Sequence, residues 1–95
     1  MDDFSIQVLR LVKALYGAVS PNFRMVMLSS ENGRWQLTFV LEREDAEDRE
    51  EIYDVVDEFE ALQEKGIGYD LHVLVSGELL VYPKVPAWVV YRRRE

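Results

Sequence analysis

The 95-residue sequence contains no cysteine and one histidine, and both shortages narrow what the chain can do. Without cysteine it cannot form a disulfide framework, a zinc ribbon or a thiol nucleophile. The apolar core must therefore supply the folding free energy alone, which suits a reducing compartment. Because 48% of the residues are hydrophobic and 31% are charged, the composition is that of a globular protein. We expect a single domain over residues 1–95.

Motifs that carry chemistry are also missing. The single histidine, His72, alternates with apolar residues in a strand-like segment, so we interpret it as an outward-facing strand residue. No serine or threonine lies in a nucleophile elbow, and no glycine-rich phosphate loop occurs. The acidic residues lack the spacing and the central glycine of an EF-hand loop. We therefore expect a protein that is not an enzyme and has no cofactor and no metal site.

We expect neither a secretory leader nor a membrane-spanning segment in this sequence. It begins Met1-Asp2-Asp3, without the basic region of a signal peptide, and no apolar run approaches the roughly 20 residues that cross a bilayer. We expect a cytoplasmic protein with no membrane partner. The net charge of −7 also argues against nucleic-acid binding, since phosphate backbones require a basic surface. The arginines at 92–94 do not change this expectation, because acids such as Glu95 can pair with them.

The spacing of apolar residues predicts an α+β fold in the order α-β-β-α-β-β. A first helix is indicated by residues that share one helical face, namely Phe4, Val8, Leu11, Val12 and Leu15. Asp2 or Asp3 can cap its start, and Gly17 fits the left-handed conformation that ends helices. Strands are indicated at 23–29, 35–41, 69–76 and 79–82, the last one broken by Pro83 and Pro86 and resuming at 87–91. We expect a two-layer sandwich with two helices on one face of a mainly antiparallel sheet.

Residues 23–41 predict a β-hairpin. Asn32-Gly33 between two apolar runs favours a type I′ turn, because both residues tolerate positive φ. This turn places Glu31 opposite Arg34, Leu28 opposite Leu37 and Val26 opposite Phe39. The face away from the core then carries Phe23, Met25, Met27, Thr38 and Val40. With Trp88 and Tyr91, this apolar face either forms a homodimer seam or is covered within the monomer.

The acidic charge is concentrated in residues 41–60 (LEREDAEDREEIYDVVDEFE). This stretch has eleven acidic residues against two arginines, a local net charge of −9, whereas the rest of the chain has a net charge of +2. A second helix is indicated by the apolar spacing of Ile52, Val55, Val56, Phe59 and Leu62. Asp45 is the predicted N-cap, and Lys65-Gly66 is the predicted end.

Two interpretations of this acidic helix remain open. A solvated charged face keeps a small protein soluble. However, the helix has almost no lysine partners at i+4, so its carboxylates repel one another. Dense carboxylates also attract basic surfaces such as nuclease active sites and RNA-binding clefts. The candidate partner-binding residues are Glu47, Glu50, Glu51, Asp54, Asp57 and Glu58.

Several segments together resemble a known group of proteins. They are LYGAVSPNFRMV (15–26), the Asn-Gly hairpin, the acidic helix ending DVVDEFEAL, and the closing VVYRRRE. They are similar to the immunity proteins of bacterial contact-dependent inhibition and polymorphic toxin systems. The resemblance implies a cognate toxin domain as partner, bound in the cytoplasm so that its active site is blocked or distorted. We expect a small acidic immunity protein against a nuclease or another basic-surfaced toxin; the alternative is a non-catalytic oligomeric accessory or regulatory protein.

Overall fold

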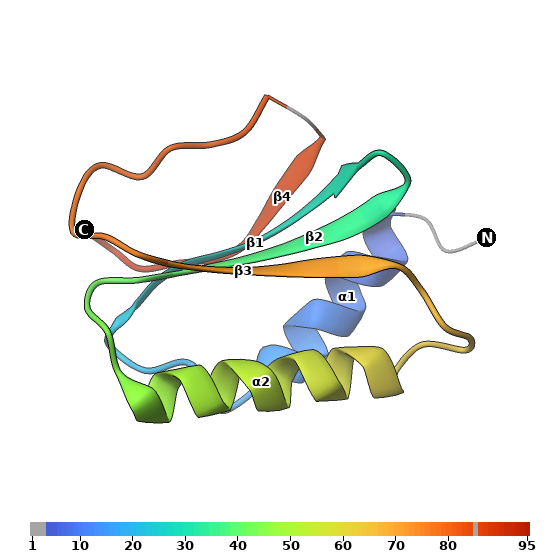
Figure 1. The fold of residues 1–95 in the computed structure, drawn as a ribbon, viewed down its shortest axis with the longest axis horizontal. Coiled ribbons are helices and arrows are strands. Elements are labelled where there is room, and N and C mark those ends of the chain that lie inside the picture. Colours follow the sequence, from blue (N-terminus) through green and yellow to red (C-terminus); the bar gives the residue numbers. More distant parts are fainter. Residues whose placement is uncertain (1–3, 85) are drawn as a thin grey trace.

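The computed structural model describes residues 4–84 and 86–95 (Figure 1). In these residues two helices and four strands follow one another in the predicted order, and both helices cover the same face of the sheet. The elements are α1 (Phe4–Leu15), β1 (Phe23–Glu31), β2 (Arg34–Leu41), α2 (Ala46–Ala61), β3 (Tyr69–Val75) and β4 (Ala87–Arg92). The predicted caps Asp2 and Asp3 lie outside the described residues, whereas Gly17 has the expected positive φ of 81°.

The sheet is mixed, so the predicted mainly antiparallel sheet is wrong. Its strand order is β3-β2-β1-β4, with β1 antiparallel to both β2 and β4. By contrast β3 is parallel to β2, with Trp35 opposite Tyr69 and Leu41 opposite Val75. The cause is α2, since a helix between two strands carries the chain back to the end of the sheet where the first strand began.

Residues 79–82 do not form a strand, contrary to the sequence prediction. The segment 76–84, which we call the strap, leaves the end of β3 and crosses the face of the sheet opposite the helices (Figure 1). At its start the Ser76 N–H donates to the Leu41 carbonyl (2.9 Å), and just beyond it the Pro86 carbonyl accepts from the Ser30 N–H (3.2 Å). Pro83 and Pro86 cannot donate to a ladder, which favours a crossing segment over a paired strand.

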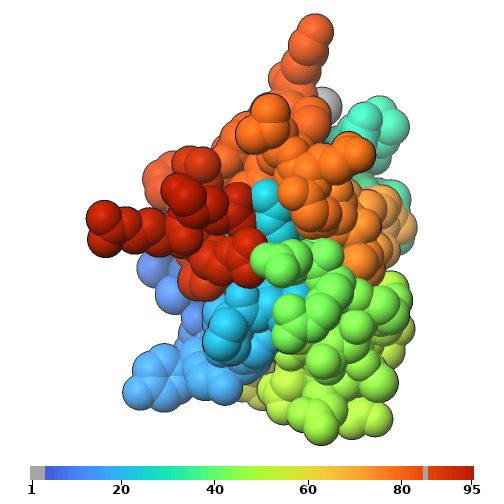
Figure 2. Space-filling view, turned by 90° about the vertical axis from the view of Figure 1, so that its left-hand side faces the viewer, coloured from blue at the N-terminus to red at the C-terminus, as the bar shows by residue number. Residues whose placement is uncertain are grey.

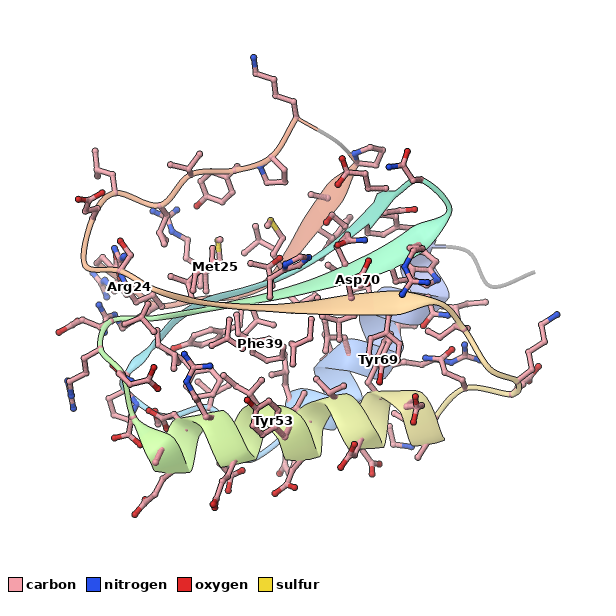
Figure 3. All side chains as sticks on the ribbon, in the orientation of Figure 1. Arg24, Met25, Phe39, Tyr53, Tyr69 and Asp70 are labelled. Atoms are coloured by element: carbon pink, nitrogen blue, oxygen red, sulfur yellow. The ribbon has the colours of Figure 1, made fainter. Side chains whose placement is uncertain are left out.

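The hairpin has the predicted register. Glu31 lies opposite Arg34, and the positive φ angles of Asn32 (53°) and Gly33 (74°) form the turn between them. The core lies between this hairpin and the helices, and Phe39 projects toward the helices while Met25 projects toward the strap (Figure 3). The residues of the sheet that fill the core are Phe23, Val26, Leu28, Leu37, Phe39 and Leu41.

Phe23 lies in the helix-side core and not on the opposite face, as the sequence predicted. It is opposite Leu41, while Met25 is opposite Val40, so Arg24 is one extra residue in β1. Such a bulge shifts the alternation of side chains by one position. Phe23 therefore contacts Phe39 edge-to-face, with the two ring centroids 6.4 Å apart.

The helices pack on the sheet with two differences from the predicted faces. In α1 the side chain of Val12 is exposed, and Gln7 is buried in its place. Gln7 and Gln63 exchange two amide hydrogen bonds of 2.9 Å each, which joins α1 to the residues after α2. Helix α2 ends at Ala61, before the predicted Lys65-Gly66 end.

Candidate functional site

The start of α2 is fixed by a cap and by a buried amide. Asp45 has an extended backbone, and its carboxylate accepts a hydrogen bond from the Asp48 N–H at 3.0 Å, so the predicted N-cap is confirmed. The Asp48 carboxylate is itself buried and accepts from the Asn22 Nδ2 at 2.9 Å. Asn22 also donates to the Arg43 carbonyl (2.8 Å) and accepts from the Arg43 N–H (3.0 Å). These bonds hold the first turn of the helix against the turn before β1.

The apolar stripe of α2 faces the core, so its charged residues are left in solvent. Ile52, Val55, Val56 and Phe59 are buried, as predicted. All six carboxylates predicted to bind a partner are exposed: Glu47, Glu50, Glu51, Asp54, Asp57 and Glu58. In Figure 3 the acidic side chains along the lower side of α2 point away from the sheet.

All six carboxylates lie on the solvent side of α2. Residues three or four apart share a helix face, so Glu47, Glu51, Asp54 and Glu58 form an outer row, and Glu50 and Asp57 adjoin it at the same spacing. Asp57 also lies three residues before Glu60, so the acidic surface continues to that residue. We call Asp57 and Glu60 the β3-facing row.

Contacts with Tyr69 show that this second row lies toward β3. The Tyr69 hydroxyl, from β3, donates to the Glu60 carboxylate at 3.1 Å, and its ring meets Phe59 edge-to-face with centroids 6.5 Å apart. Burial raises the pKa of Tyr69, and the negative charges of Glu60 and Asp57 raise it further. Glu60 is not among the residues predicted from the sequence to bind a partner. The spacing of three residues from Asp57 indicates that Glu60 lies on the same helix face. That spacing points to a contact with β3 only once the position of β3 is known.

Little positive charge balances these rows. The one basic residue of α2, Arg49, makes a bidentate ion pair with Glu44, which precedes the helix. That hydrogen bonding raises the pKa of Arg49 and lowers the pKa of Glu44. Arg49 is therefore engaged with a residue that precedes α2, and the exposed carboxylates of the helix face solvent with their like charges largely uncompensated.

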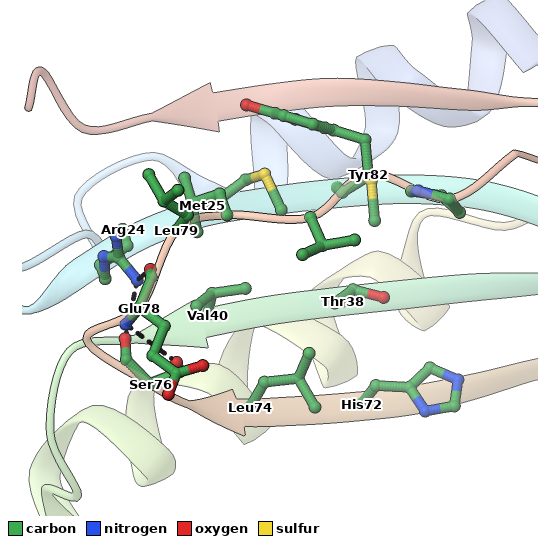
Figure 4. Close-up of a pocket in the computed structure, with 14 residues that line it drawn as sticks. Arg24, Met25, Thr38, Val40, His72, Leu74, Ser76, Glu78, Leu79 and Tyr82 are labelled. Atoms are coloured by element: carbon green, nitrogen blue, oxygen red, sulfur yellow. Dashed lines mark hydrogen bonds between the residues drawn. The ribbon is translucent and has the colours of Figure 1, made fainter.

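The opposite face of the sheet is covered by the strap, beneath which a groove of about 500 Å³ remains (Figure 4). Met25, Met27 and Val40 are buried there and pack against Leu80 of the strap. Of the two alternatives predicted from the sequence, a homodimer seam or a face covered within the monomer, the structure shows the second. Trp88 does not extend this face, because it lies on the helix side of the sheet beside Phe4 and Val8 of α1. The residues proposed as a dimer seam therefore do not form one exposed surface.

Arg24, the bulge residue of β1, fastens the strap. Its Nη1 donates to the carbonyls of Ser76 (2.8 Å) and Glu78 (2.7 Å), as the dashed lines in Figure 4 mark. Its Nε and Nη2 donate to the two carboxylate oxygens of Glu95, each at 2.8 Å. Figure 2 shows the C-terminal residues, in red, beside the start of the strap, in orange. Sequence reasoning missed this role, because each acceptor lies more than 50 residues from Arg24.

His72 lies exposed on β3, facing outward as predicted, with its Nε2 2.6 Å from the Gln36 Oε1. Among the residues that the structure describes, no three or more His, Asp or Glu side chains are grouped to hold a metal ion. Neither α1 nor α2 has the length and apolar character needed to span a membrane.

Comparison with known proteins places this chain in a family. No curated protein matches the sequence. The sequence profile of the MafI2 immunity protein family, however, matches residues 7–95, which include every helix and strand described above except the first turn of α1. The chain therefore belongs to the MafI2 immunity protein family, which confirms its resemblance to the immunity proteins of polymorphic toxin systems.

Proposed function

We propose that this protein neutralises a cognate toxin domain by binding a basic surface of that toxin through the exposed carboxylates of α2. The single observation that carries the proposal is the exposure of all six predicted carboxylates on a helix whose one arginine is engaged elsewhere. Membership of an immunity protein family supports a toxin as the partner. A nuclease or another toxin that acts on nucleic acid fits best, since such enzymes carry the positive potential that binds phosphates. We further propose that the protein acts in the cytoplasm, without catalysis, cofactor or nucleic acid.

The physical basis is electrostatic complementarity. Carboxylates held on one rigid helix create a local field that attracts a positively charged surface and raises the rate of association. In the free protein these like charges oppose one another, and a basic partner removes that cost. Binding over a phosphate-binding cleft would then exclude the nucleic-acid substrate, so no chemistry is required from the immunity protein.

Charge reversal on the outer row tests this proposal. Glu51→Lys, Asp54→Lys and the double variant are titrated against a candidate cognate toxin domain, at two salt concentrations, and tested for growth rescue. The control for each single variant is Glu31→Lys, which makes the same change of charge at the exposed hairpin turn. We expect the double variant to associate at least about tenfold more slowly at low salt, with a smaller effect at high salt.

Two results would contradict the proposal in different ways. If the toxin binds and growth is rescued equally by all variants, the protein is an immunity protein whose interface lies away from the outer row. If the wild-type protein neither binds the toxin nor rescues growth, this toxin is not its partner and the proposed pairing fails.

A further inference from the structure

The outer edge of β3 presents backbone groups that no neighbouring strand uses. The Trp35 N–H donates to the Gly68 carbonyl (3.0 Å), and the Ser76 N–H donates to the Leu41 carbonyl (2.9 Å). In a parallel pair of strands, every second residue directs both its N–H and its C=O toward the neighbouring strand. The even-numbered residues from 68 to 76 therefore bond to β2. The N–H and C=O groups of the odd-numbered residues point away from the sheet. Among the described residues no strand pairs with this edge of β3.

One of these outward groups already has a partner. The Tyr69 carbonyl accepts a hydrogen bond from the Arg34 Nη2 at 2.7 Å. The open row therefore begins after Tyr69 and consists of the backbone of Leu71, Val73 and Val75. Each of these residues offers one donor and one acceptor in the spacing that a further strand requires.

This edge lacks the features by which proteins normally prevent strand addition, which are short strands, bulges, prolines and charged side chains. Strand β3 has seven residues, and its register with β2 is unbroken. It contains no lysine, arginine or proline, and its one acid, Asp70, is paired with Arg34. Its exposed side chains are apolar near the end, with Leu74 at 51% and Val75 at 41% exposure.

The other edge of the sheet is different. Strand β4 has six residues, ends at Arg92 and pairs with β1 through a bulge between Val26 and Met27. Pro86 precedes it directly. The sheet therefore has one protected edge and one open edge, and the open one lies beside α2 at the front of Figure 1.

The charges beside β3 decide which kind of strand fits there. A strand added to this edge lies about 4.8 Å beyond β3, so its helix-side residues lie toward the β3-facing row of Asp57 and Glu60, the two carboxylates whose charges act on Tyr69. Its other residues lie on the side of Leu74. An extended segment that alternates basic and apolar residues matches both sides.

A second copy of this chain matches less well. Antiparallel pairing of two β3 edges about a twofold axis keeps both α2 helices on the same side of the joined sheet. The two acidic stretches, each with a net charge of −9, would then lie next to each other. Their repulsion disfavours this dimer relative to a basic partner.

We infer that the toxin adds an extended basic and apolar segment to the free edge of β3 as a fifth strand, with its basic residues against the β3-facing row. This inference rests on the proposed function and deepens it. The carboxylates of α2 attract the toxin, and the backbone of Leu71, Val73 and Val75 fixes its position through main-chain hydrogen bonds.

Amide hydrogen exchange measured by NMR on the full chain tests this inference directly. In the free protein we expect the amides of Leu71, Val73 and Val75 to exchange at least about a hundredfold faster than those of His72 and Leu74, since only the latter are bonded in the ladder. On addition of the same toxin domain, the three fast amides should slow by at least about tenfold. A tight complex in which they stay fast would overturn the inference and leave the proposed function intact. Slow exchange in the free protein that depends on protein concentration would overturn it in favour of self-pairing.

A matched pair of lysine substitutions gives a second test. Leu74→Lys places a positive charge at the open edge, whereas Leu9→Lys makes the same change on α1, where Leu9 is 68% exposed. We expect Leu74→Lys to weaken toxin binding by about tenfold or more and Leu9→Lys to leave it unchanged. Equal losses would show only a general charge effect, and a loss confined to Leu9→Lys would place the interface on α1; both results overturn the inference. If the toxin does not bind the wild-type protein at all, the proposed function fails, and the inference fails with it.

Discussion

Arg24 and Glu95 lie 71 residues apart in the chain and meet in a bidentate ion pair, in which the guanidinium of the buried arginine binds the side-chain carboxylate of Glu95. Arg93 also donates to this carboxylate and to Glu42, so two cations surround Glu95. The same Arg24 bonds the carbonyls of Ser76 and Glu78. One side chain therefore ties the strap, the C-terminal residues and β1 together.

The pair predicts a contribution to stability that depends on pH. Hydrogen bonding to Arg24 and Arg93 lowers the pKa of Glu95 to about 2. A lowered carboxyl pKa means that the contribution is complete above the unfolded-state pKa, near 4.3, and is lost as the pH falls toward 2. We expect Glu95→Gln to lower the urea midpoint at pH 7, with the difference from wild type disappearing near pH 2. Glu31→Gln, at the exposed hairpin turn, is the control; an equal loss there would contradict the role of the pair.

The N-cap of α2 predicts a second effect. Asp45→Ala removes the acceptor for the Asp48 N–H, which should lower the free energy of unfolding by about 1 kcal/mol. Asp45→Ser keeps an acceptor at this position and should restore most of the loss. Urea unfolding followed by circular dichroism measures both. If serine and alanine are equally harmful, the cap is not the cause.

The strap offers two adjacent leucines in opposite environments. Leu80 packs on Met25, Met27 and Val40, whereas Leu79 is 92% exposed. We expect Leu80→Ala to cost about 1–2 kcal/mol, below the range for a fully buried leucine, and Leu79→Ala to cost less than about 0.5 kcal/mol. Thermal unfolding of the two variants provides the comparison. Equal values would mean that the strap does not pack on the sheet.

Met27 predicts how the covered face responds to charge. Because its side chain is buried under the strap, Met27→Glu should lower the free energy of unfolding by about 3 kcal/mol or more and leave the oligomeric state of the folded protein unchanged. Met27→Leu, which nearly conserves volume, should cost less than about 1.5 kcal/mol. Size-exclusion chromatography with urea unfolding separates these effects. A stable variant that changes from oligomer to monomer would restore the dimer seam as an explanation.

The features that could be predicted from the sequence are those set by neighbouring residues. The turn at Asn32-Gly33 fixed the hairpin register, and the Asp45 cap with its apolar stripe predicted α2 and the exposure of its carboxylates. These features depend on backbone preference and on periodicity over a few residues.

The features that could not be predicted depend on distant contacts. A single-residue bulge at Arg24 reversed the side on which Phe23 lies, and no local pattern marks such a shift. The apolar run at 79–82 has the composition of a strand, but it crosses the sheet unpaired and packs on Met25, Met27 and Val40 through Leu80. The extension of the acidic surface to β3 became visible only when Tyr69 located β3 beside Glu60.

The crossing path of the strap also bears on how this protein can diverge in evolution. Leu79 and Val81 are 92% and 83% exposed on a segment that is held at its ends and at Leu80. Substitutions at these positions change the shape and chemistry of one surface without altering the packing between helices and sheet. The fold thus provides a region where new surface variants can accumulate while the stability of the domain is preserved.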